Sequence, residues 1–235
     1  MKRLFIFTCL FLSSIFSYGQ KSGEVLKFLG FPVDGSKEKM IQNLRTKGFT
    51  YNAKYDNLTG KFNGHDASIY ISTNYGKVDR VYVGNYNETK SEAEIIIAFN
   101  TLLKQFEGNS KYTSLVPNES IKSGEDISYE MSVNNKRYQA SFWLLPQIDT
   151  VEFYNHMNLL YSAKFNNLHT DEEAYNKLTE EEKEKLRIEM LIVLCDELEK
   201  RAIGCVWFMI HEEYGEYSIG IYYDNLKNRP NGEDL

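Results

Sequence analysis

The sequence predicts an α+β protein in which antiparallel meanders and hairpins form the sheet and helices pack on one sheet face. Three observations predict this class: short runs in which apolar and polar residues alternate, two-residue turn signals between those runs, and capped segments with apolar residues at helical spacing. A continuous strand–helix–strand pattern is missing, which disfavours a parallel doubly wound sheet.

The first helix and the strands after it carry the clearest signals. Ser36 is a suitable N-cap for a helix that ends at Gly48. Alternating runs follow over residues 58–83, and Asn63-Gly64 among them is a strong two-residue hairpin signal. A second turn signal lies at residues 74–76. We therefore expect a three-stranded antiparallel meander.

A second helix and a polar connector complete the first half of the chain. The capping box Thr89–Glu92 opens this helix, and Gly108 ends it. Residues 109–125 are polar and contain Pro and Gly, which is typical of a connector. We expect an N-terminal half over residues 20–108 and a loosely similar C-terminal half over residues 126–235. The two halves could also form one continuous domain.

The C-terminal half combines two hairpins with helices between them. Alternation predicts paired strands over residues 127–133 and 137–145. Capping boxes at Thr170–Glu173 and Thr179–Glu182 then open two helices. A last hairpin turns at Tyr214-Gly215. The stretch between the first hairpin and these helices shows no pattern that assigns it.

The N-terminus has the three parts of a secretory signal peptide, residues 1–19. Lys2 and Arg3 give the positive start, an apolar run of about thirteen residues follows, and Ser17-Tyr18-Gly19 supplies the small residues of a cleavage site. The alternative is an uncleaved anchor, but a helix that spans a bilayer needs roughly 20 apolar residues. We expect a protein exported to the periplasm or secreted.

The net charge excludes some classes of partner, and the cysteine content leaves a disulfide open. The formal net charge is −6, and removal of Lys2 and Arg3 with the signal peptide makes it −8. An acidic chain lacks the basic footprint of a nucleic-acid-binding protein, and no later stretch predicts membrane insertion. Cys195 and Cys205 remain in the mature chain, and the sequence fits a disulfide and two buried thiols equally well.

No catalytic, metal-binding or cofactor-binding motif is found. The nucleophile elbow, the dinucleotide and phosphate loops and the zinc helix are all missing, and His211-Glu212-Glu213 has no second histidine at zinc-binding spacing. The acidic clusters 171–173 and 180–184 open predicted helices, where acids favour the helix dipole. We therefore expect neither a metal nor a cofactor.

The face of the sheet opposite the core is the most informative feature. Strand alternation assigns to it small hydroxyl side chains and aromatic rings with few charges. The residues on this face are Ser68, Tyr70, Ser72, Arg80, Tyr82, Ser128, Glu130, Ser132, Arg137, Gln139, Ser141, Trp143, Ser218 and Tyr222. The candidate binding residues among them are Tyr70, Arg80, Tyr82, Arg137, Trp143 and Tyr222. Tyr, Trp and Arg dominate the anchors of protein interfaces, although an ordinary solvated sheet face shows a similar composition.

Three segments carry a resemblance to known proteins. Phe-Leu-Gly-Phe-Pro-Val-Asp-Gly at 28–35, Lys-Gly-Phe-Thr-Tyr at 47–51 and the C-terminal stretch 222–235 resemble a group of uncharacterised exported bacterial proteins. The order of helix and meander is similar to small periplasmic modules of the β-lactamase-inhibitor-protein and PepSY types. That architectural likeness implies protein binding or inhibition through an open sheet.

Three function classes remain open from the sequence. The leading one is a non-enzymatic exported module that binds a protein, such as another envelope protein, or a polar ligand on the open sheet face. The second is an exported hydrolase whose acids converge only in three dimensions, and a cleft with two carboxylates would support it. The third is a structural envelope protein.

Overall fold

A computed structural model describes residues 25–89 and 91–230 of the chain, and the expected signal peptide lies outside these residues. The described chain forms two compact units. One contains residues 25–144 and 202–230 and is built around a sheet. The other, Leu145–Arg201, is helical. The division therefore differs from the two halves expected on either side of the connector 109–125.

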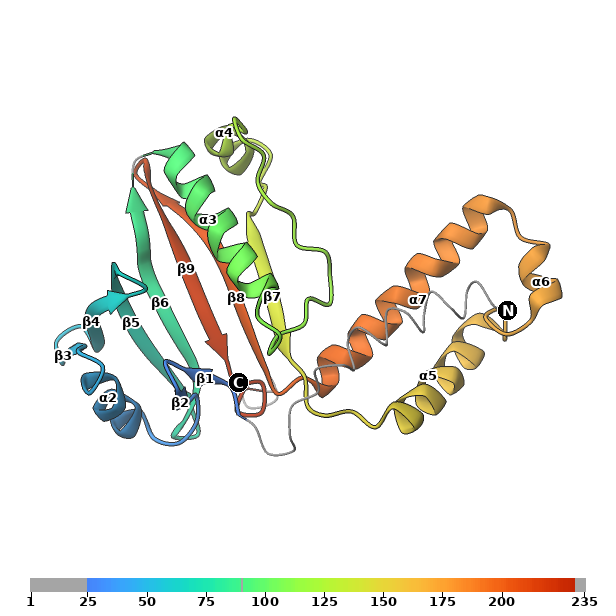
Figure 1. The fold of residues 1–235 in the computed structure, drawn as a ribbon, viewed down its shortest axis with the longest axis horizontal. Coiled ribbons are helices and arrows are strands. Elements are labelled where there is room, and N and C mark those ends of the chain that lie inside the picture. Colours follow the sequence, from blue (N-terminus) through green and yellow to red (C-terminus); the bar gives the residue numbers. More distant parts are fainter. Residues whose placement is uncertain (1–24, 90, 231–235) are drawn as a thin grey trace. The chain divides into compact units, whose positions relative to one another are not determined.

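The sheet unit holds a seven-stranded antiparallel sheet, coloured from cyan through green and yellow to red in Figure 1. In spatial order its strands are β3 (Thr50–Asn52), β4 (Asn57–Phe62), β5 (His65–Asn74), β6 (Lys77–Thr89), β9 (Glu216–Asp224), β8 (Gly204–Glu213) and β7 (Gln139–Leu144). A separate two-stranded sheet pairs β1 (Lys27–Phe28) with β2 (Phe31–Pro32). Because β6 pairs with β9, segments from both ends of the chain share one sheet.

The tight turns at Asn63-Gly64 and Tyr214-Gly215 confirm the two hairpins that the sequence predicts there. Asn63 and Gly64 have φ values of 47° and 85° between β4 and β5. Tyr214 and Gly215 have φ values of 54° and 76° between β8 and β9. Two central residues with positive φ match the right-handed twist of paired strands. The meander β4–β5–β6 forms as predicted.

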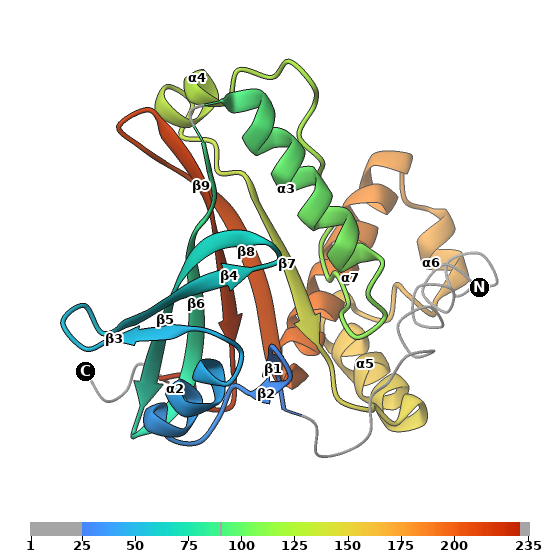
Figure 2. The same cartoon turned by 60° about the vertical axis from the view of Figure 1, so that its left-hand side comes forward.

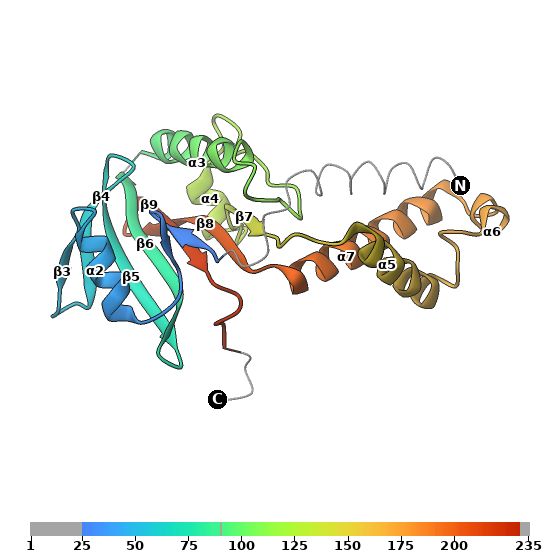
Figure 3. The same cartoon turned by 60° about the horizontal axis from the view of Figure 1, so that its bottom comes forward.

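Helices α2 (Lys37–Arg45) and α3 (Glu92–Glu107) pack on the same face of the sheet. Figures 2 and 3 show α3 lying along the strands. Ser36 caps α2 by accepting a hydrogen bond from the Lys39 backbone, as predicted. One core cluster unites the buried side chains of both helices with the inward residues of the strands. The α+β fold with helices on one sheet face is therefore confirmed.

The cap of α3 differs by two residues from the expected Thr89–Glu92 box. Ser91 is the N-cap, and its hydroxyl accepts a hydrogen bond from the Glu94 backbone. The Thr89 hydroxyl donates instead to the Glu94 carboxylate. The carboxylate of Glu92 accepts a bond from the backbone of Ile127. The Glu92 carboxylate therefore bonds the backbone of a residue distant in the sequence and does not cap the start of α3 as the capping box predicts.

The segment expected as a strand over residues 127–133 is the short helix α4 (Ile127–Ser132). Asp126 caps it by accepting from the Tyr129 backbone at 2.8 Å. Ile127 and Met131, four residues apart, contact the core, whereas Tyr129 and Val133 are exposed. The strand prediction fails because apolar residues spaced by two and by four overlap in so short a run. Ser128, Glu130 and Ser132 consequently do not lie on the sheet.

With α4 removed from the sheet, β7 is an edge strand, and the connector closes its outer side. Thr113 and Trp143 exchange two backbone hydrogen bonds of 2.9 and 2.8 Å. The Asn118 side chain bonds both the N–H and the C=O of Ser141, each at 3.1 Å. The connector therefore satisfies backbone groups that an edge strand otherwise leaves open.

The helical unit is an insertion between β7 and β8. It contains α5 (Thr150–Phe165), α6 (Glu172–Asn176) and α7 (Glu180–Arg201). The Thr179–Glu182 capping box is confirmed at the start of α7, whereas Asp171 rather than Thr170 caps α6. Within the described part of the chain, no helix is both long and apolar enough to cross a membrane.

The sequence pattern did not predict helix α5, because its apolar residues lie on more than one side of the helix. Phe153, Met157 and Phe165 are buried at helical spacing, but Val151 and Leu159 are exposed. An apolar pattern that runs around the helix gives no clear amphipathic signal. The capping residue, Asp149, accepts bonds from the two backbone N–H groups of residues 151 and 152.

A charged cluster connects α5 and α7. The Glu197 carboxylate is almost fully buried and contacts His156 at 2.8 Å, Lys200 at 2.6 Å and Arg201 at 2.9 Å. The hydrogen bond from Lys200 is the main cause that lowers the pKa of Glu197 to about 2. A buried carboxylate is tolerated when several charged donors surround it.

Candidate functional site

Four aromatic side chains form a continuous row across the middle of the sheet. Tyr70 on β5 pairs with Tyr82 on β6, Tyr82 pairs with Tyr222 on β9, and Tyr222 pairs with Trp207 on β8. Directly opposed residues of neighbouring antiparallel strands project to the same side. That side is opposite the core cluster on which α2 and α3 pack. We call Tyr70, Tyr82, Tyr222 and Trp207 the aromatic ladder.

The ladder rings stack on one another. Ring centroids lie 5.7 Å apart between Tyr70 and Tyr82, 4.6 Å between Tyr82 and Tyr222, and 3.8 Å between Tyr222 and Trp207. The last pair is nearly parallel, with 6° between the ring planes. Stacked pairs add stability beyond their buried area. Because the inner ring faces are used in stacking, the ladder presents mainly ring edges and hydroxyl groups.

A partly buried ion pair fixes the Trp207 end of the ladder. Arg80 reaches Asp224 with two hydrogen bonds, 2.5 Å from Nε to Oδ1 and 2.7 Å from Nη2 to Oδ2. Trp207 Nε1 donates to the same carboxylate at 3.0 Å. The Arg80 guanidinium also lies 5.4 Å from the ring centroid of Tyr222 and 5.8 Å from that of Trp207. Bidentate pairing and cation–π contacts hold these side chains in one arrangement.

Hydroxyl groups continue the network along β9 and β8. The Tyr222 hydroxyl lies 3.2 Å from His211 Nε2. Burial raises the pKa of Tyr82 to about 12 and also raises the pKa of Tyr222. Burial lowers the pKa of His211. The tyrosine hydroxyls therefore stay protonated at neutral pH, and the surface offers uncharged donors and acceptors.

Two glycines give the rings space to lie close to the sheet. A Cβ atom at Gly220 would lie 2.5 Å from His211 Nε2 and 3.1 Å from Cε2 of Tyr82. A Cβ atom at Gly84 would lie 3.1 Å from Cε1 of Tyr82. Glycine in a strand often marks such a close approach. The positions of Tyr82 and His211 therefore depend on neighbours that lack side chains.

The structure brings together four of the six residues selected from the sequence: Tyr70, Arg80, Tyr82 and Tyr222. Trp143 has the expected parity, but its side chain is only 8% exposed. Arg137 precedes β7 and is not part of the sheet. The alternation in the sequence extends back to Arg137, whereas the strand itself begins at Gln139.

Three residues of the site were missed from the sequence: Trp207, His211 and Asp224. Strand β8 is apolar on both faces, so alternation alone did not separate Trp207 from the core residues around it. The turn at Tyr214-Gly215 carries the missing signal, because a two-residue turn there places Trp207 directly opposite Tyr222. Asp224 follows on the same face.

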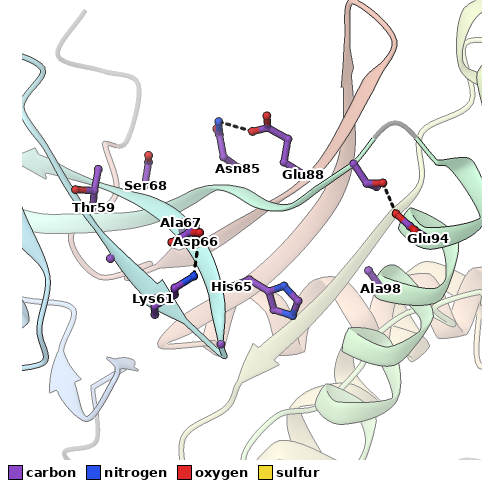
Figure 4. A pocket seen from close by; sticks show the side chains of 13 residues that line it. Thr59, Lys61, His65, Asp66, Ala67, Ser68, Asn85, Glu88, Glu94 and Ala98 are labelled. Atoms are coloured by element: carbon purple, nitrogen blue, oxygen red, sulfur yellow. Dashed lines mark hydrogen bonds and ion pairs between the residues drawn. The ribbon is translucent and has the colours of Figure 1, made fainter.

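A hollow of about 770 Å³ lies elsewhere in the sheet unit, beside the β4–β5 hairpin and the start of α3 (Figure 4). Its acidic residues are each held by a neighbour (Figure 4). Asp66 pairs with Lys61 at 2.9 Å, Glu88 accepts from Asn85 at 2.9 Å, and Glu94 accepts from Thr89. The remaining lining residues are Thr59, Gly60, Gly64, His65, Ala67, Ser68 and Ala98. These carboxylates act in local pairs and caps.

The cysteines and other metal-ligating side chains are dispersed. Cys195 lies in α7 and Cys205 in β8, so the two belong to different units. Among the described residues, no group of three or more His, Cys, Asp or Glu side chains is placed to hold a metal ion.

Comparison of the chain with protein-family models, curated proteins and solved structures found no match. The α+β class is therefore established by the structure itself, and the aromatic ladder is the feature on which a function is argued.

Proposed function

We propose that this protein is an exported, non-enzymatic binding module whose aromatic ladder is the recognition surface. The observation that supports the proposal most directly is the continuous stack of four aromatic rings on the sheet face opposite the helices. Tyr and Trp supply large contact area at a low entropic cost, and Tyr, Trp and Arg are the residues most enriched at binding hot spots.

The shape of the ladder favours a protein partner over a small ligand that stacks on a ring. A stacking ligand needs an open ring face, and Tyr82 and Tyr222 use both of theirs within the ladder. Ring edges and neutral hydroxyls on a sheet instead suit a broad contact with hydrogen bonds at its rim. The Arg80–Asp224 pair adds no net charge, so the contact does not require a strongly charged partner.

The first test removes ladder side chains and measures capture of a partner. The chain from Gln20 onward serves as bait for an envelope extract of the native host, and captured proteins are quantified by mass spectrometry. Tyr70→Ala and Tyr82→Ala should each weaken capture of the same partner about 30-fold, which corresponds to ~2 kcal/mol at a hot spot. Tyr55→Ala is the matched control, since Tyr55 is an exposed tyrosine outside the ladder.

A second variant changes the shape of the ladder without removing any of its residues. Gly220→Ala forces His211 and Tyr82 to move, so it should also reduce capture while circular dichroism shows a folded chain. If Tyr55→Ala and Tyr82→Ala lower capture equally, or if neither lowers it, the ladder is not the recognition surface.

A further inference from the structure

Helix α7 carries a second row of apolar side chains on the side away from its buried row. The buried row packs into the helical unit and consists of Leu186, Met190, Val193, Leu194 and Leu198. Ile188, Leu191 and Ile192 lie on the other side and are 50%, 41% and 52% exposed. Helical residues three and four positions apart share a face. We call Ile188, Leu191 and Ile192 the outer stripe. An exposed apolar cluster of this kind usually marks an interaction surface.

The outer stripe lies at the midpoint of α7, which extends from Glu180 to Arg201. A second copy of α7 can therefore lie antiparallel across it, with a two-fold axis near residues 191 and 192. In that arrangement Leu191 of each copy faces Ile192 of the other. A two-fold interface joins the same patch of both subunits and is therefore closed. The two helix dipoles also oppose each other favourably.

The charged residues beside the outer stripe favour a second copy of α7 as the partner that covers it. Lys183, Arg187 and Lys200 are paired within α7. Lys185 and Asp196, in contrast, make no ion pair with any residue that the structure describes, and neither does Glu199. All three are exposed. Lys185 and Asp196 lie on the flank next to Ile192, and Glu199 lies two turns after Ile192 and nearly in line with it.

The two-fold arrangement supplies these charges with partners. A two-fold axis perpendicular to the helices brings equal flanks together. In an antiparallel pair with its axis between 191 and 192, a residue of one helix and the residue beside it on the other helix have numbers that add up to about 383. Lys185 of one copy therefore lies beside Asp196 and Glu199 of the other. The same pairing recurs at the other end of the interface. Opposite charges on the flanks of an apolar seam set partner and orientation in paired helices.

We propose that the protein forms a homodimer through antiparallel pairing of α7, with the outer stripe as its apolar centre and Lys185 opposite Asp196 and Glu199 at its flanks. The dimer would display two copies of the sheet unit. This inference uses residues of the helical unit alone and does not depend on the role of the aromatic ladder.

Sedimentation of the chain from Gln20 onward tests the dimer. At about 10 μM, where a complex with a micromolar dissociation constant is populated, the mass should be that of two chains. Leu191→Glu should raise the dissociation constant about 100-fold, because it places an unpaired charge in the apolar centre. Ile97→Glu is the matched control, since Ile97 is 66% exposed on α3 and should leave the dimer intact.

A charge exchange tests the antiparallel orientation of the two α7 helices independently of folding defects. Lys185→Glu should weaken the dimer about tenfold through repulsion of Asp196 and Glu199. Adding Asp196→Lys to the same chain should restore association. A monomeric chain at 10 μM would overturn the proposal. So would a dimer that survives Leu191→Glu, or a dimer in which the second charge change fails to rescue the first.

Discussion

His169 is a half-buried histidine whose two ring nitrogens are buried and have no hydrogen-bond partner among the described residues. The ring of Tyr161 meets it edge-on at 5.6 Å, and the Tyr161 hydroxyl donates to the Met190 carbonyl instead. Burial therefore lowers the pKa of His169 from its usual 6.5. A proton added here would have no acceptor nearby.

Stability should consequently fall in mild acid. The folded-state pKa of His169 lies below its unfolded value, so the unfolded chain binds the proton more readily. The contribution of the neutral ring is fully present above about pH 6.5 and is lost progressively as the pH falls below that value. His169→Phe should make the urea midpoint of the helical unit less dependent on pH between 7.5 and 5, measured by hydrogen exchange of the α5 and α7 amides in urea.

Two other groups define the control for this experiment. Burial also lowers the pKa of His211 in the sheet unit, so His211→Phe should change the pH dependence of the sheet unit and leave that of the helical unit unchanged. The lowered pKa of Glu197 acts in a more acidic window, because its stabilisation is lost only as the pH falls below about 4.5. An unchanged pH dependence in His169→Phe would contradict the assignment.

Among the elements, β7 shows how a side chain can replace a strand. The Asn118 amide bonds both backbone groups of Ser141, which is what a neighbouring strand would do. Asn100 on α3 forms the same pair of hydrogen bonds with the backbone N–H and C=O of Ile121, each at 2.8 Å. Two asparagines therefore hold the connector in place, and the connector keeps the edge of β7 closed.

Asn118→Ala should open that edge. Two backbone groups of Ser141 lose their partners, so the free energy of unfolding should fall by about 1–3 kcal/mol. An unpaired edge also recruits other chains, and light scattering should show association that grows with concentration. Asn134→Ala is the matched control, because the Asn134 side chain donates an exposed hydrogen bond to the Glu130 carboxylate. Equal effects from the two variants would mean that the cap is not important.

For the whole molecule, the helical unit is an insertion whose ends meet. Leu144 and Gly204 are opposed in the β7–β8 pair, and the Ile203 backbone donates to the Leu144 carbonyl at 2.9 Å. The strands on both sides are thus already aligned where the insertion begins and ends. The core cluster of the sheet unit contains no residue of Leu145–Arg201.

Replacing Leu145–Arg201 by Asn-Gly should therefore leave a folded sheet unit. The new connection is a short hairpin loop between two paired strands. The variant should unfold cooperatively in denaturant, with a smaller m value that reflects its smaller buried surface. It should also be monomeric, as the dimer proposal requires. Loss of the cooperative transition would show that the sheet unit needs the insertion in order to fold.

Much of the local structure could be predicted from the sequence because it depends on neighbouring residues. Asn63-Gly64 and Tyr214-Gly215 specify hairpins through backbone conformations that few residue pairs adopt. Ser36 and Thr179 mark helix starts through bonds within one turn. The α4 segment was mispredicted because six residues are too few to separate a period of two from one of 3.6. Helix α5 was missed because its apolar residues lie all around it.

Part of the candidate site could be predicted for the same reason. Tyr70 and Tyr82 belong to one local meander, and alternation alone assigns them to one face. Trp207 could not be assigned in this way, because β8 is apolar on both of its faces. Asp224 could not be assigned either, because β9 ends at this residue.

The sequence by itself determined the α+β class, the hairpins at Asn63-Gly64 and Tyr214-Gly215 and the starts of α2 and α7, and it supplied the expectation of export. The tertiary structure decided that β6 pairs with β9 and that the helices of 145–201 form a separate unit. It also stacked Tyr82 on Tyr222, which is 140 residues away in the chain. Turns and caps are fixed by bonds between near neighbours. Pairing between distant strands depends instead on which apolar faces can be buried together, and no short stretch of sequence encodes that choice.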